Sequence, residues 1–151
     1  MRAIVQRVSC ATVSVGGQEV GRCGYGLLLL VGVHREDDET NARKLADKIA
    51  KLRIFSDALG KMNLALLDFP SEAGFEYDVL AVSNFTVFGD TVKNRRPSFM
   101  ESAPFERGQQ LFERFVEDLK GSGVSVQTGA FGAHMAVALV NDGPVTLVVD
   151  A

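Results

Sequence analysis

The stretch Ser83-Asn84-Phe85-Thr86 places two hydroxyl groups three positions apart, with an amide between them. These residues close a predicted strand and open a long loop, where side chains leave a rigid scaffold. Such a set can bind or activate a substrate carbonyl. No nearby His, Lys or Asp is available in the sequence to activate Ser83 or Thr86 as a nucleophile. Ordinary hydrogen bonding at the end of a strand is the alternative interpretation.

A second stretch, Phe131 to Met135, reads FGAHM and lies between two predicted strands. Its ring and its thioether are four positions apart, and Gly132 and Ala133 leave space beside them. A nucleic-acid base can stack on such a pair. Packing of Phe131 and Met135 in the protein core is the alternative.

The dipeptide Gly143-Pro144 introduces the last apolar strand, Val145 to Val149. Glycine allows backbone angles that other residues avoid, and proline fixes φ and removes an N–H. A tight turn explains the pair. The other interpretation is that a rigid piece of backbone is directed at a ligand.

The local basic cluster, Lys93, Arg95 and Arg96, falls in a loop. A solvated turn and a contact for phosphate groups are both open interpretations. The formal net charge of −3 argues against a protein that coats nucleic acid through a broad basic face. It is compatible with a protein that grips only a short end of RNA.

Metal and cofactor sites have little to build on. The sequence has two histidines and no HxxxH, HExxH or CxxC spacing, so we predict no metal and no cofactor. Cys10 and Cys23 fall on predicted strands, where two buried free thiols of a cytosolic chain are expected and a disulfide is the alternative. No apolar run approaches the roughly 18 residues of a membrane span, and the N-terminus shows no signal peptide. A cytoplasmic protein is predicted.

The elements that position these residues follow from the hydrophobic pattern, which indicates a single domain over residues 1–151. One helix opens at the acidic residues 36–39, and a second has Pro104 in its first turn. Between Thr86 and Ala103 no period is visible, and a loop of that length is usually functional. Strands are predicted over 2–15, 18–23, 27–33, 52–66 around a turn at 57–60, 78–85, 124–129, 135–140 and 145–150. The expected class is therefore α+β, with mostly antiparallel, barrel-like sheet and two helices.

Taken together, six stretches in this order resemble the D-aminoacyl-tRNA deacylases nearly end to end. They are MRAIVQRVS, KMNLAL, SNFT, RRPSF, FGAHM and NDGPVT. The resemblance implies that family's fold and an enzyme that hydrolyses the ester of D-aminoacyl-tRNA at the 3′ CCA end. In such an enzyme Ser83, Phe85 and Thr86 lie beside the ester, with Asn84 in place of the family's Gln.

The same resemblance implies the remaining roles. Phe131 and Met135 match the pocket for the terminal adenine, and the Lys93, Arg95 and Arg96 cluster then lies near phosphates. The Gly143-Pro144 pair matches a cis peptide that each subunit of a homodimer inserts into its partner's active site. Its carbonyls would exclude an L side chain from the site.

An aminoacyl ester is already activated, so positioning and an oxyanion site can suffice for its hydrolysis. The resemblance implies that the enzyme uses water, backbone N–H groups and the substrate's own 2′-OH in place of a protein nucleophile. Glycine lacks a Cβ, which makes glycyl-tRNA a predicted side substrate. Two further interpretations stay open: a dimeric module that binds tRNA ends without catalysis, and a serine esterase using Ser83, which lacks an evident base.

Overall fold

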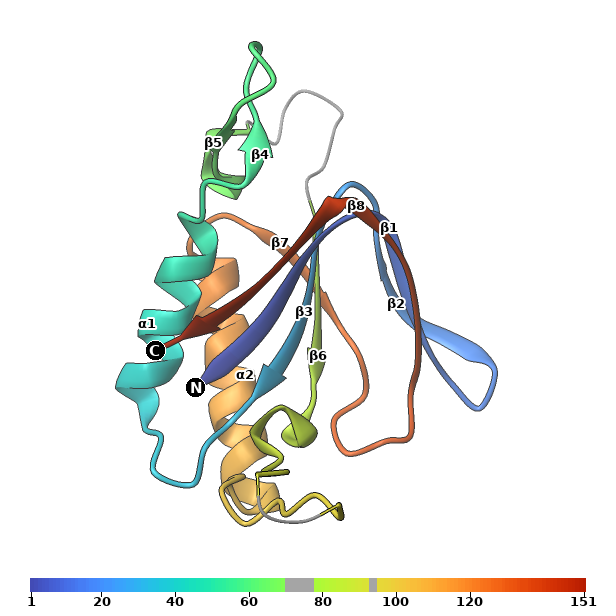
Figure 1. The fold of residues 1–151 in the computed structure, drawn as a ribbon, viewed down its shortest axis with the longest axis vertical. Coiled ribbons are helices and arrows are strands. Elements are labelled where there is room, and N and C mark those ends of the chain that lie inside the picture. The colour runs from blue at the N-terminus through green and yellow to red at the C-terminus, as the bar shows by residue number, and fades with distance from the viewer. Residues whose placement is uncertain (70–77, 93–94) are drawn as a thin grey trace.

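A computed structural model describes residues 1–69, 78–92 and 95–151, which form a curved sheet with two helices packed against it (Figure 1). The sheet order is β2-β1-β3-β6-β7, and β8 pairs with β1. A separate hairpin, β4-β5, extends away from the sheet (Figure 1). The elements are β1 (Arg2–Val15), β2 (Gln18–Cys23), β3 (Gly26–Gly32), α1 (Glu39–Ala50), β4 (Phe55–Ser56), β5 (Met62–Leu64), η1 (Leu66–Asp68), β6 (Asp78–Ser83), η3 (Phe85–Phe88), α2 (Phe105–Gly121), β7 (Ser125–Thr128) and β8 (Ala136–Asp150).

The central strand β3 is apolar on both faces because both faces are covered. Leu27 and Leu29 belong to the core between the sheet and the two helices. Leu28 points to the other face, into a smaller cluster with Val8 and Leu80. Successive side chains of a strand alternate between faces, so an unbroken apolar run is typical of such a doubly covered strand.

Both helices begin where the sequence predicts a start. Asp38 caps α1, and its carboxylate accepts hydrogen bonds from the backbone N–H groups of Thr40 and Asn41. The bond from Asn41 is the larger cause of a pKa of Asp38 below its ordinary value. Pro104 directly precedes α2. The inward faces of both helices pack in one core, which includes Leu45, Ile49, Leu111, Phe112, Phe115 and Leu119.

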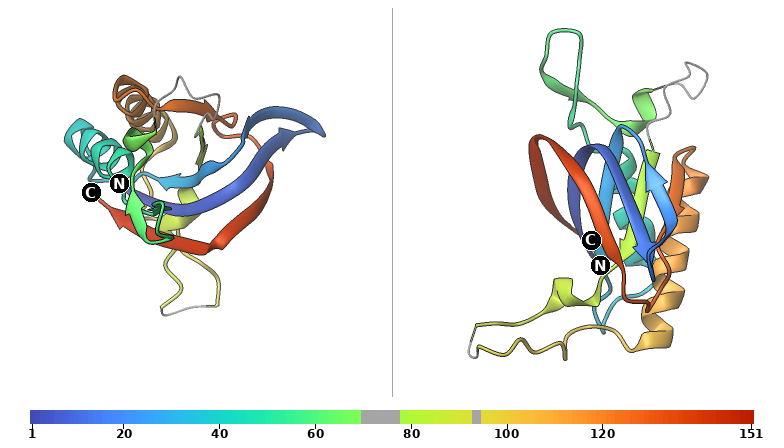
Figure 2. Two further views of the ribbon diagram at one scale, coloured as in Figure 1. Left: turned by 90° about the horizontal axis from the view of Figure 1, so that it is seen from above. Right: turned by 90° about the vertical axis from the view of Figure 1, so that its right-hand side faces the viewer.

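The expected α+β class with a curved, barrel-like sheet and two helices is confirmed (Figure 2). Strand β1 pairs antiparallel with β2, β3 and β8. Strand β6 instead pairs parallel with both β3 and β7. These two parallel pairings were not predicted, because the prediction assumed connections by hairpins. The connections instead contain α1 and α2, and each brings the chain back to the end of the sheet where the preceding strand began.

The end of the chain differs from the prediction of two strands joined by a tight turn at Gly143-Pro144. Residues 136–150 form one strand, β8, which follows β1 over nearly its whole length. The pairs Gln6–Thr146 and Val8–Asn141 leave one residue on β1 opposite four on β8, residues 142–145. The turn prediction was wrong: this segment is a large bulge within a continuous strand.

Three smaller findings concern the two cysteines, the segments outside the described residues, and the length of the helices. Cys10 is exposed, so the prediction of two buried thiols holds only for Cys23, and both cysteines are free. Cys10 lies beside an irregularity in the β1–β8 register, which turns its side chain outward. Most of the predicted loop at 69–77 and Lys93 lie outside the described residues. No described helix has the length and apolar character needed to cross a membrane.

Candidate active site

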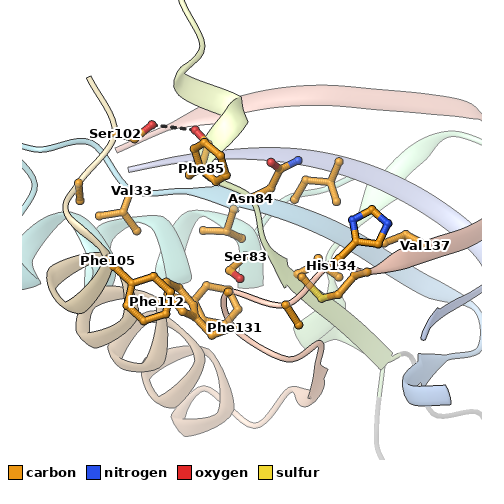
Figure 3. A pocket seen from close by; sticks show the side chains of 18 of the residues that line it. Val33, Ser83, Asn84, Phe85, Ser102, Phe105, Phe112, Phe131, His134 and Val137 are labelled. Atoms are coloured by element: carbon orange, nitrogen blue, oxygen red, sulfur yellow. Dashed lines mark hydrogen bonds between the residues drawn. The ribbon is translucent and has the colours of Figure 1, made fainter. Parts of the chain in front are cut away.

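A cavity of about 800 Å³ lies between the face of the sheet that carries Leu28 and Val82 and the first turns of α2 (Figure 3). The end of β6, the segment that precedes α2 and the segment that leads into β8 surround it. Its side chains are mostly apolar, and the polar ones are Gln6, Ser83, Asn84, Ser102 and His134. No Asp, Glu, Lys or Arg belongs to the described lining.

The structure brings three residues of the first stretch to the cavity, namely Ser83, Asn84 and Phe85. The half-buried Ser83 hydroxyl has no hydrogen-bond partner in the described part of the chain. Asn84 Oδ1 accepts from the backbone N–H of Thr86 at 3.1 Å and from its hydroxyl at 2.5 Å. Thr86 is exposed and does not line the cavity, and its hydroxyl is held by Asn84. The shorter amide at position 84 therefore caps the η3 turn.

The segment after η3 forms a second wall. Ser102 Oγ donates to the carbonyl of Phe85 at 2.8 Å, and Ala103 N donates to Val33 O at 2.9 Å. These bonds fix the segment against the ends of β3 and β6. Arg95 and Arg96 lie on the same segment, are exposed and form no ion pair with any described residue.

The third wall is aromatic. The Phe131 ring packs against Phe105 at a centroid distance of 5.1 Å and against Phe112 at 5.9 Å. Gly132 has φ of +73°, and a Cβ there would lie 2.5 Å from the Phe105 ring, so only glycine leaves room for it. Phe131 and Met135 both line the cavity. Phe131 therefore packs against the core and also lines the cavity (Figure 3).

Gly143 and Pro144 are exposed and do not line the cavity of their own chain. The peptide bond between them is cis, and Gly143 has φ of +119°. Asn141 Nδ2 closes the bulge by donating to Val145 O at 3.0 Å and to Arg7 O at 2.9 Å. The projecting backbone is thus held at its base by side-chain hydrogen bonds.

The side chain of Arg7 supports the bulge from below. Its Nε lies 2.8 Å from Asp142 Oδ2, without the alignment of a hydrogen bond, and its Nη1 donates to Ile54 O at 2.6 Å. Arg7 is 7% exposed, the one buried charged residue in the described core. Burial of this charge is offset by the carboxylate of Asp142.

Sequence reasoning missed four residues of this arrangement. His134 belongs to the FGAHM stretch but was given no role there, yet it lines the cavity (Figure 3). Gln6, Arg7 and Tyr25 were given no individual role either: Gln6 lines the cavity, and Arg7 and Tyr25 both contact Asp142. Only Arg7 gave a signal in the sequence, and that signal was weak. A charged residue at an inward-facing position of a strand predicts a buried partner of opposite charge. Among the described residues, no group of three or more His, Cys, Asp or Glu side chains is placed to hold a metal ion.

Comparison with known proteins identifies the family. The family model of the D-Tyr-tRNA(Tyr) deacylases matches residues 4–150. The chain belongs to this family. A protein from Thermosipho africanus, named D-aminoacyl-tRNA deacylase, is 51% identical over 151 residues, which cover 100% of this chain and 97% of the relative. A protein of the same name from Symbiobacterium thermophilum is 52% identical over 151 residues, covering 100% and 96%.

Solved structures share the fold of this deacylase-family chain. The c-Myc DNA Unwinding Element Binding Protein superimposes with a TM-score of 0.88 at 34% identity, covering 100% of this chain and 99% of that one. A probable eukaryotic D-amino acid tRNA deacylase superimposes with a TM-score of 0.82, covering 99% and 98%. Its 19% identity shows a common fold only.

Proposed function

We propose that this protein hydrolyses the ester bond of D-aminoacyl-tRNAs and releases the free D-amino acid and tRNA. One observation carries the proposal: the cavity of a chain in this family presents Ser83 and Asn84 in apolar surroundings without a charged catalytic group. Such a site suits an ester that is already activated. Positioning and stabilisation of the oxyanion then supply the catalysis.

The local geometry favours positioning over covalent catalysis. Ser83 makes no hydrogen bond to His134 or to any other described base, and Thr86 is held away by Asn84. The backbone N–H of Asn84 donates to Val31 O at 2.8 Å, whereas that of Phe85 has no acceptor in the described chain. The Phe85 N–H is therefore a donor for the developing oxyanion, and the Ser83 hydroxyl orients the ester or the water.

The remaining walls suit the 3′ end of tRNA. The terminal adenine stacks on Phe131 and Met135, which line the cavity at its aromatic wall. Arg95 and Arg96 lie on the segment that forms the second wall and are free to contact phosphates. Lys93 is assigned the same role from its position in the sequence.

The Gly143-Pro144 segment serves a second subunit. It is exposed, projects from β8 as a bulge and is absent from the cavity lining of its own chain. In a symmetric dimer the same segment enters both partner cavities. Its backbone carbonyls then occupy the space that an L side chain needs, and this excludes L-aminoacyl esters. Glycyl-tRNA passes because glycine has no Cβ.

The deciding experiment compares D-tyrosyl-tRNA with L-tyrosyl-tRNA as substrates at micromolar enzyme, together with sedimentation of the protein. We expect turnover of the D ester, rejection of the L ester and a dimer. Binding of both tRNAs without turnover would instead favour a module that holds tRNA ends. A fully active, stable monomer would refute the shared site, and a trapped acyl-enzyme on Ser83 would favour the serine esterase.

A further inference from the structure

Tyr25, in the short connection between β2 and β3, contacts the base of the Gly143-Pro144 bulge. Its hydroxyl donates to Asp142 Oδ2 at 3.0 Å. Its ring packs against Phe55 at a centroid distance of 5.9 Å, and Phe55 is 1% exposed. Since Phe55 is fixed in the core at the base of the β4-β5 hairpin, the tyrosine ring has a rigid support.

The same carboxylate oxygen forms an ion pair with Arg7. Arg7 Nε lies 2.8 Å from Asp142 Oδ2, so the arginine and the tyrosine share this atom. Arg7 Nη2 also lies 3.1 Å from the point where a Cβ on Gly143 would stand. The position of Asp142 is therefore defined from two elements, β1 and the β2–β3 connection, and Gly143 follows it directly in the chain.

We infer that Tyr25 is a positioning residue that determines stereospecificity through Asp142. The inference rests on the proposed role of Gly143-Pro144 as the chiral filter. A filter made of backbone carbonyls excludes the L side chain only while those carbonyls keep their position, and small displacements in a site have large effects on rate. The Tyr25 hydroxyl limits that displacement without touching the substrate.

The size of the effect follows from the exposure of the contact. Tyr25 is 37% exposed and the Asp142 side chain is also 37% exposed, so water replaces part of the lost hydrogen bond. Removing the hydroxyl in Tyr25→Phe keeps the ring against Phe55. We expect the ratio of D-tyrosyl-tRNA to L-tyrosyl-tRNA hydrolysis to fall roughly two- to tenfold.

The experiment uses the full chain and four variants, assayed at a temperature where all are folded. Tyr25→Phe is compared with Ser122→Ala, which removes an exposed hydroxyl bonded to Asp118 O at the end of α2. Asp142→Ala and the double variant Tyr25→Phe/Asp142→Ala complete a cycle. Each protein is measured for the ratio of D to L hydrolysis and for the amide resonance of Gly143 by NMR.

The inference expects Tyr25→Phe to move the Gly143 resonance and to lower the ratio, Ser122→Ala to change neither, and the double variant to match Asp142→Ala. An unmoved Gly143 resonance, or an unchanged ratio, overturns it. A further fall in the double variant also overturns it, because Tyr25 would then act independently of Asp142. A wild-type protein that does not discriminate between D and L esters refutes the proposed function itself, whatever the resonance shows.

Discussion

Replacement of Gly143 by alanine tests whether the rigid bulge sets both stability and stereospecificity. Gly143 has φ of +119°, a conformation that residues with a side chain rarely adopt. A Cβ there would lie 2.8 Å from Val145 Cγ2 and 3.0 Å from Val145 N. Valine is restricted at χ1 and its nitrogen belongs to the backbone, so neither atom moves away easily.

The magnitude follows from these contacts. An L residue held in such a conformation costs about 1–3 kcal/mol. For a domain of this size each kcal/mol lowers the melting temperature by about 2–4 °C, so we expect a decrease of roughly 2 to 12 °C. If the chain avoids the strain by displacing the bulge, the carbonyls of residues 143 and 144 leave their position. Hydrolysis of D-tyrosyl-tRNA then falls at least about tenfold.

Thermal unfolding and single-turnover hydrolysis measure the two effects. Gly121→Ala is the matched control, because Gly121 ends α2 and a Cβ there meets no atom within 4 Å. This control should melt with the wild type or slightly above it, since alanine restricts the unfolded chain. If Gly143→Ala melts like the control and keeps the full preference for the D ester, the reasoning about the bulge is refuted.

Three further predictions concern the cavity, the basic segment and acid stability. Ser83→Ala and Thr86→Ala each lower kcat/KM by about tenfold at most, the worth of one hydrogen bond. A loss of several orders of magnitude in pre-steady-state kinetics would instead indicate a nucleophile. Charge reversal of Arg95 and Arg96 weakens tRNA binding, most strongly at low salt, as fluorescence anisotropy across a salt series can measure; equal loss at all salt concentrations would contradict phosphate contacts. Backbone N–H groups of Lys61 and Leu59 donate to the Asp57 carboxylate and lower its pKa. The ionised carboxylate therefore stabilises the fold fully when the pH is above the ordinary pKa of Asp, and this stabilisation is lost as the pH falls toward the lower pKa of the folded state. Asp57→Ala should thus lower the melting temperature at pH 7 and differ less from the wild type below about pH 4; a constant difference across that range would exclude this role.

Local pattern was enough to predict the helices and most strands. In α1 the residues Ala42, Leu45, Ala46 and Ile49 repeat at helical spacing, and all four are buried. Leu52, at the next position of that pattern, falls after the helix end at Ala50 and is only half-buried. The pattern identifies the buried face of the helix, whereas the position of the helix end depends on backbone hydrogen bonds.

The partners of each strand were harder to predict from the sequence than the strands themselves. The alternation in residues 2–15 predicts a strand but does not name its partners, and β1 pairs with β8 across more than 100 positions. The parallel pairing of β3 with β6 likewise depends on how α1 packs on the sheet. A local turn signal at Gly143-Pro144 was therefore overruled by pairing on both sides of it, which kept β8 a single strand.

The candidate site divides in the same way. The sequence by itself determined which residues have suitable chemistry, such as Ser83, Phe131 and Met135. This was possible because residue type and the local hydrophobic pattern can both be seen within a short stretch of the sequence. Only the tertiary structure decided that His134 lines the same cavity. It also decided that Asp142 contacts both Tyr25, 117 positions before it, and Arg7, 135 positions before it. The physical reason is that burial and hydrogen bonding depend on which distant elements pack together, and this is a property of the whole fold.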